Sequence, residues 1–133
     1  MQDGSRDGHK TIAYGSRQHA VTTRQSQFVF IPTGRANTFI IKVVDENLFL
    51  HAWGGSQQGA SIKLHGDEAY ARSHDNSQFE VIPHGGTFAL RARRSNLCIH
   101  AFGGSKAGAE FKLHGNVEYA RKHSNSQFLF VPV

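Results

Sequence analysis

An internal repeat is the feature of this sequence that most constrains its fold. Residues 48–83 and 97–132 align without a gap at a shift of 49 residues, and 21 of the 36 paired positions are identical. Identity at a fixed period over such a length indicates one supersecondary unit that is stacked on copies of itself. We therefore expect the chain to be built from such copies.

A third copy, which is incomplete, precedes the other two. Its Ser-Gln-Phe tripeptide starts at residue 26 and matches the tripeptide that starts at residue 77, at a shift of 51 residues. In this register the first copy lacks the part of the unit that comes before the Gly-Gly-Ser turn. We expect a single domain over residues 1–133, with a partial first repeat at 1–37, a second repeat at 38–86 and a third repeat at 87–133.

Each full repeat predicts four short strands. In residues 38–44, Phe39, Ile41 and Val43 point to one side and their neighbours to the other, which is the period of a strand. Residues 67–76 and 116–125 are expected to hold a single helical turn each and no more. The predicted strands are 11–14 and 26–31 in the first repeat, 38–44, 48–52, 61–65 and 78–82 in the second, and 87–93, 97–101, 110–114 and 127–131 in the third.

Four short strands per unit, repeated in three units, predict an all-β fold of the β-trefoil type, here with about ten strands instead of twelve. In a β-trefoil the first and fourth strands of each unit form a barrel, and the second and third strands form hairpins that cap it. Phe28, Phe79 and Phe128 occupy equivalent positions and are expected to form one layer of the core. A β-sandwich is the alternative, but a sandwich does not predict a threefold repeat.

No pattern in the sequence is typical of an enzyme or a metal site. Gly-x-Ser-x-Gly, phosphate-loop and His-Glu-x-x-His motifs do not occur, and the histidines lack the close spacing of zinc ligands. The single cysteine, Cys98, excludes an intrachain disulfide, and its counterpart Phe49 indicates a packed side chain rather than a nucleophile. We expect no catalysis, no cofactor and no bound metal.

Charge and hydropathy limit which partners the protein is expected to bind and in which compartment it is expected to lie. The formal net charge of +5 is mild, and the one basic cluster, Arg91, Arg93 and Arg94, is not repeated in the second copy. Such a local cluster is typical of a solvated hairpin edge, so we expect no nucleic-acid partner. The start of the chain lacks the apolar core of a signal peptide, and no apolar run reaches membrane-spanning length. We expect a cytoplasmic or non-classically secreted protein.

Two segments resemble a known lectin family. HAWGGS at residues 51–56 and KLHGDEAY at residues 63–70 resemble the mytilectins, galactose-binding β-trefoil lectins with a His-Pro-x-Gly-Gly motif and a downstream Leu-His-x-Asp-x-His motif. Ala52 replaces the motif proline, and Ala69 replaces the second motif histidine. The resemblance implies a carbohydrate-binding lectin without catalysis, whose partners are glycans of the galactose or N-acetylgalactosamine type.

A more distant similarity implies a different function. HGGTFALRAR at residues 84–93 is similar to the Gly-Gly linker and alternating strand of the fascin and hisactophilin trefoils. This alternative is a cytosolic trefoil that binds actin or a membrane surface.

The mytilectin resemblance implies two sets of sugar-binding positions. A carboxylate accepts charge-assisted hydrogen bonds from sugar hydroxyls, paired glycines let the backbone approach the ring, and an indole offers a flat apolar face. Asn116 stands where the second repeat has Asp67, so the second repeat is expected to hold the better site. His51 and His100 have an alternative role as turn-stabilising residues. The candidate residues are His51, Trp53, Gly54, Gly55, His65 and Asp67 in the second repeat, and His100, Gly103, Gly104, His114 and Asn116 in the third.

The incomplete first repeat predicts an unpaired edge in the barrel. An exposed strand edge carries N–H and C=O groups that pair readily with another chain. We therefore expect a homo-oligomer that forms through the first repeat, unless the native protein carries a further hairpin upstream.

Overall fold

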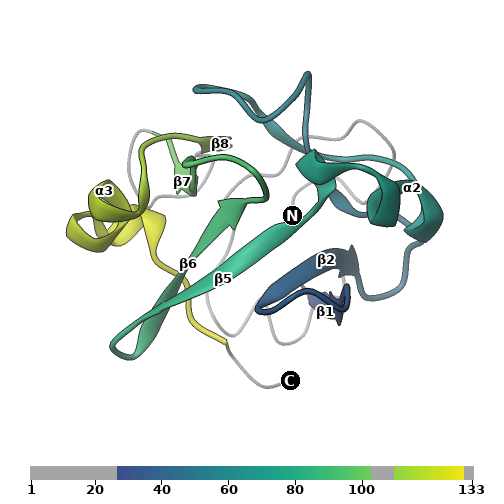
Figure 1. Ribbon diagram of the computed structural model, residues 1–133, viewed down its shortest axis with the longest axis horizontal. Helices are drawn as coiled ribbons and strands as arrows, with labels where there is room; N and C mark the ends of the chain where they lie inside the picture. Colours follow the sequence, from purple (N-terminus) through teal and green to yellow (C-terminus); the bar gives the residue numbers. More distant parts are fainter. Residues whose placement is uncertain (1–26, 103–109, 131–133) are drawn as a thin grey trace.

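The computed structural model describes residues 27–102 and 110–130 (Figure 1). Within these ranges no helix is long and apolar enough to cross a membrane. The elements, in chain order, are β1 (Phe28–Pro32), β2 (Thr38–Val43), β3 (Leu50–Ala52), β4 (Ile62–Leu64), α2 (Glu68–Ser73), the 3₁₀ turn η2 (Asp75–Ser77), β5 (Phe79–His84), β6 (Thr87–Ala92), β7 (Ile99–Ala101), β8 (Phe111–Leu113), α3 (Val117–Lys122) and the 3₁₀ turn η3 (Ser124–Ser126).

The barrel wall is an antiparallel sheet with the order β1-β2-β5-β6. A bridge between Phe88 and Phe128 continues this sheet beyond β6. The strand pairs β3–β4 and β7–β8 form two separate hairpins, one in each full repeat. In Figure 1 the helices α2 and α3 lie on opposite sides of the long β5–β6 hairpin. The first and fourth strands of the repeats therefore form the wall, and the second and third strands form the caps, as the repeat predicts.

The main core lies between the wall and the hairpins. Ile41 and Val43 of β2 pack in one buried cluster with residues of the hairpins and with Phe79 of β5, which is fully buried. Ile41 and Val43 lie on one side of the alternating pattern in β2, and Ile40 on the other side is buried in a second cluster with Phe49 and Ala71. Burial of these side chains stabilises the fold, because the hydrophobic contribution scales with the apolar area removed from water.

The predicted aromatic layer is wrong for one of its three members. Phe79 is buried and Phe128 is partly buried against the core, but Phe28 is 37% exposed. Within the described residues, β1 lies at the end of the sheet order and pairs with β2. Phe30 packs against the core instead, with its ring centroid 5.1 Å from that of Phe130.

The helical segments are longer than predicted. Each contains a six-residue α-helix followed by a three-residue 3₁₀ turn, where a single turn was expected. Both ends of α2 have hydrogen-bonding partners, which explains why so short a helix forms. Asp67 accepts a hydrogen bond from the Tyr70 N–H at the start, and the Gln78 side-chain amide donates to the carbonyl oxygens of Ala71 and Arg72 at the end.

The strand boundaries differ from the prediction by a few residues. The hairpin strands are three residues long where five were predicted, and β5 extends to His84. Of the predicted strand 127–131, the structure shows only the bridge at Phe128, and residue 131 lies outside the described residues. The predicted strand 11–14 also lies outside them.

Candidate functional site

His51 is held inside the protein by both of its ring nitrogens. It lies in β3 and is 5% exposed. Its Nδ1 lies 2.5 Å from Ser77 Oγ, and its Nε2 lies 3.1 Å from Asn76 Nδ2. Asn76 Nδ2 also donates to the Ala52 carbonyl oxygen at 2.9 Å, which identifies that atom as the amide nitrogen. Nε2 of His51 therefore accepts a hydrogen bond, and Nδ1 carries the proton and donates it to Ser77 Oγ.

His100 makes the same contacts one repeat later. Its Nδ1 bonds Ser126 Oγ, and its Nε2 lies 3.0 Å from Asn125 Nδ2. Burial lowers the pKa of His100 below its usual value, and the nearby charges of His114 and His123 lower it further. Both histidines therefore join a hairpin to the 3₁₀ turn that follows the helix, and this geometry supports the turn-stabilising role.

Asp67 is the N-cap of helix α2. Its Oδ1 accepts a hydrogen bond from the Tyr70 N–H at 2.9 Å, and its side chain is exposed. Capping uses Oδ1, and a carboxylate accepts up to about four hydrogen bonds. The other lone pairs of Asp67 are the acceptors at this surface that a ligand hydroxyl would use.

Aromatic rings extend from the helix cap to the tip of the hairpin. The ring of Tyr70 stacks on His74 at 3.7 Å and meets His65 edge-on at 4.9 Å. His65 in turn meets Trp53 edge-on at 5.1 Å, and Trp53 is 42% exposed. We call Trp53, His65, Asp67 and Tyr70 the hairpin face.

The turn next to the hairpin face depends on two glycines. Gly54 has a φ of +82° and Gly55 a φ of +110°, conformations that L side chains rarely adopt. The sequence predicts that these glycines let the backbone approach the ring of a ligand. The structure shows that the turn itself also requires glycine at both positions. Lys63 lies on the neighbouring strand, with its ammonium 4.5 Å from the centroid of the Trp53 ring. A sugar that stacks on this indole has to avoid or displace Lys63.

The corresponding face of the third repeat is occupied from within the protein. Gln58, which belongs to the second repeat, lies with its Nε2 2.5 Å from His114 Nδ1, and its Oε1 accepts a hydrogen bond from the Gly115 N–H. Asn116 caps α3 as Asp67 caps α2, with a bond of 2.9 Å from the Tyr119 N–H. The predicted site residues Gly103 and Gly104 lie outside the described residues.

Several residues with clear roles escaped the sequence analysis. Asn76 and Ser77 bind His51, Gln78 closes α2, and Lys63 covers Trp53. A signal for the first three was present, because Asn-Ser-Gln is identical in both full repeats. No pattern pointed to Gln58, because its contact joins two repeats at a sequence separation of 56 residues. Over residues 27–102 and 110–130, no three His, Cys, Asp or Glu side chains gather in a way that could hold a metal ion.

Comparisons with known proteins agree with this geometry. The chain matches the family described as "Ricin-type beta-trefoil lectin domain-like" over residues 24–114. A designed threefold-symmetric protein, ThreeFoil, has a similar crystal structure, with a TM-score of 0.82 and 17% identity over 99% of this chain and 87% of that chain. A search of curated proteins found no match.

These findings confirm the predicted β-trefoil and the coarser part of the lectin resemblance. The likeness to ThreeFoil supports the fold alone, because the sequence identity is low. The family match spans more than half of the chain. This chain belongs to the ricin-type β-trefoil lectin-like family.

Proposed function

We propose that the hairpin face binds a terminal sugar of the galactose or N-acetylgalactosamine type, without catalysis. One observation carries the proposal. The exposed Asp67 carboxylate uses only its Oδ1 to cap the helix of Tyr70, and the Tyr70 ring is linked through His65 to the exposed Trp53. A carboxylate beside an exposed aromatic ring suits a sugar, which has hydroxyls on its edges and C–H groups on its faces.

Each residue of the hairpin face has a distinct role in this proposal. Asp67 accepts hydrogen bonds from two hydroxyls, and the Trp53 indole contacts the sugar C–H groups. His65, between them, adds a polar contact. His51 and Tyr70 position this group from below, since the ring centroid of His51 lies 5.0 Å from that of His65 and 5.5 Å from that of Tyr70. His51 is therefore a positioning residue, and it does not itself bind the sugar.

The second repeat holds the stronger site. In the third repeat, Asn116 offers a neutral oxygen in place of a carboxylate, and Gln58 already contacts the ring of His114. Hydrogen bonds to a charged acceptor are about twice as strong as neutral ones. Binding at His114 and Asn116 would also require Gln58 to move.

Glycan-array binding that free galactose competes away tests the proposal. Retention of galactose-terminated glycans by the folded chain, lost on addition of the monosaccharide, is the expected result. Binding to actin or to anionic vesicles without any glycan retention would favour the cytosolic alternative instead. Lys63→Met is a useful companion variant, because it removes the ammonium over Trp53 and keeps the aliphatic stem. If the sugar displaces Lys63, this variant binds more tightly.

A further inference from the structure

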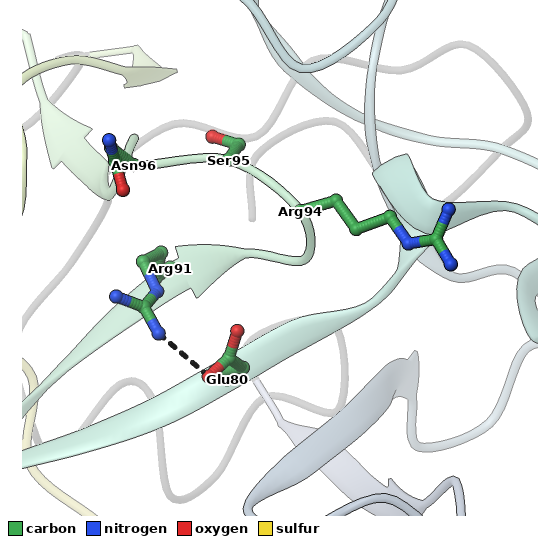
Figure 2. A pocket seen from close by; sticks show the side chains of 5 residues that line it. All are labelled: Glu80, Arg91, Arg94, Ser95 and Asn96. Atoms are coloured by element: carbon green, nitrogen blue, oxygen red, sulfur yellow. Dashed lines mark hydrogen bonds and ion pairs between the residues drawn. The ribbon is translucent and has the colours of Figure 1, made fainter.

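A polar pocket lies on the barrel wall. It has a volume of about 320 Å³ and is lined by Glu80 of β5, Arg91 of β6, and Arg94, Ser95 and Asn96 of the turn that follows β6 (Figure 2). We call it the wall pocket. Its volume is at the small end of the range for ligand pockets, which is suitable for a monosaccharide. None of its residues belongs to the hairpin face.

The wall pocket contains hydrogen-bonding groups that the protein leaves unused. Glu80 and Arg91 are paired across β5 and β6, and Arg91 Nη2 donates to Glu80 Oε2 at 2.9 Å. Arg91 Nε is buried and has no partner within the described part of the chain. In that same part, the structure shows no hydrogen bond for Glu80 Oε1 or for the side-chain amide of Asn96. Arg91 Nε is enclosed and out of reach of a ligand, whereas Glu80 Oε1 and the Asn96 amide line the pocket and are open to one.

The fold itself does not require this pair. One repeat earlier, the equivalent strand pair β1–β2 has the same antiparallel register, with Val29 opposite Lys42. The Lys42 ammonium turns back to the carbonyl oxygens of Val43 and Val44, at 3.0 and 3.1 Å. The wall of a trefoil repeat therefore forms with an apolar residue at the position of Glu80. Of the two equivalent strand pairs that the structure describes, β1–β2 and β5–β6, only β5–β6 has the carboxylate–guanidinium pair.

The charges of the wall pocket favour a neutral ligand rather than an anion. Glu80 and Arg91 balance each other, and their side chains are 27% and 29% exposed. Figure 2 shows the Arg94 guanidinium pointing away from Glu80 and Arg91. Its Nε lies 3.6 Å from Asp75 Oδ2, and Asp75 also contacts Arg93, so this one carboxylate is shared between two guanidinium groups. The centre of the pocket thus offers an acceptor, a donor and an amide close together, on a carboxylate–guanidinium pair whose two charges balance.

We infer that the wall pocket is a second saccharide-binding site, which takes the hydroxyl-rich edge of a neutral sugar. A hydroxyl both donates and accepts a hydrogen bond. One hydroxyl donates to Glu80 Oε1 while a neighbouring hydroxyl accepts from the guanidinium of Arg91, and Asn96 binds either kind of group. The ligand class rests on the proposed function, but the site shares no residue with the hairpin face. Two sites on one chain would add avidity toward a branched glycan.

Nuclear magnetic resonance distinguishes the two sites on the full chain. Arginine Nε–H groups and backbone amides are to be followed while galactose, glucose or mannose is added, with sodium sulfate and sodium glucuronate as anionic probes at matched ionic strength. At least one neutral hexose should shift the Arg91 Nε–H and the amides of Ser95 and Asn96 to saturation. Larger shifts with sulfate or glucuronate, or no saturable shift with any of the hexoses, would overturn the inference.

A double variant provides the matched control. Glu80→Val with Arg91→Lys copies the junction of the preceding repeat, so the wall is expected to fold unchanged. Sugar affinity measured from the Asn96 amide should fall by about tenfold or more, since hydrogen bonds to charged groups are lost. Asp67→Asn should leave that signal unchanged and weaken binding only at the hairpin face. Unchanged shifts at Asn96 in the double variant would refute the wall site while leaving the proposed function standing.

Discussion

The variant Asp67→Asn separates the two roles of this side chain in the structure. As the N-cap of α2, Asp67 accepts a hydrogen bond from the Tyr70 N–H at 2.9 Å. Asn116 caps α3 with an identical distance to the Tyr119 N–H, so an asparagine fits this position in the same fold. As the proposed sugar acceptor, however, Asp67 depends on its charge. Asparagine keeps the cap and removes the charge.

The two roles predict different magnitudes. Asparagine and aspartate cap helices about equally well, whereas alanine costs about 1 kcal/mol. Asp67→Asn should therefore leave the free energy of unfolding within about 0.5 kcal/mol, and Asp67→Ala should lower it by about 1 kcal/mol, or a few degrees in Tm. Loss of hydrogen bonds to a charged group costs about 1.5–3 kcal/mol, so both variants should bind sugar about 10- to 100-fold more weakly.

Calorimetric titration with galactose and thermal unfolding of the same samples measure both quantities. Full sugar affinity in a folded Asp67→Asn protein would remove Asp67 from the binding site. A loss of stability in Asp67→Asn as large as that in Asp67→Ala would refute the capping argument. The variant Asn116→Ala is the matched control, because it removes the equivalent cap from the third repeat. It should lower stability and leave the strong sugar site intact.

Four further predictions follow from the described contacts. The lowered pKa of His100 means that this side chain resists protonation in the folded protein, so its contribution to the free energy of unfolding should be present above about pH 6.5 and be lost as the pH falls below that value. Equal stability toward urea at pH 7.5 and at pH 5.5 would contradict this. Burial raises the pKa of Cys98 to about 11, so the native thiol should react slowly with iodoacetamide at pH 8, and the free energy of unfolding should fall as the pH rises from about 9 toward 11. Equal rates of alkylation in the native and the denatured protein would refute the effect of burial. Gly66→Ala should lower the free energy of unfolding by about 2 kcal/mol or more, because the new Cβ would lie 2.6 Å from the Tyr70 ring. In the control Gly59→Ala the new Cβ meets no atom within 4 Å, so this variant should lose only the backbone cost of about 1–2 kcal/mol. Finally, three apolar side chains are exposed, Phe28 to 37%, Leu129 to 65% and Phe130 to 63%. Sedimentation should therefore show concentration-dependent self-association that Phe130→Ser reduces. A protein that stays monomeric at millimolar concentration would count against this association.

The repeat was sufficient to predict the fold. A unit that recurs at a fixed period must bury its apolar face against its own copies, and few architectures allow three units to do so. The alternation in residues 38–44 and the turn glycines identified the strands of each unit. The lengths of α2 and α3 were underestimated, because their ends are completed by Gln78 and Gln127, which lie beyond the helices.

The sequence also brought one region to attention as a candidate site, but it did not distinguish the possible roles of the residues in it. His51 and Asp67 were both candidate sugar ligands, and the pattern of residues was the same for either role. Whether a histidine faces solvent or the interior depends on which groups approach its ring. Those groups, Asn76 and Ser77, lie 25 and 26 residues further along the chain.

By itself, the sequence determined what is local or periodic in this protein: the repeats, the strand pattern and the turns. These features depend on the preferences of neighbouring residues and on a period that can be read along the chain. Only the tertiary structure decided that Phe28 is exposed, that Gln58 meets His114, and that Glu80 and Arg91 form a pocket. Each of these depends on contacts between segments that folding brings together, and such contacts have no period in the sequence.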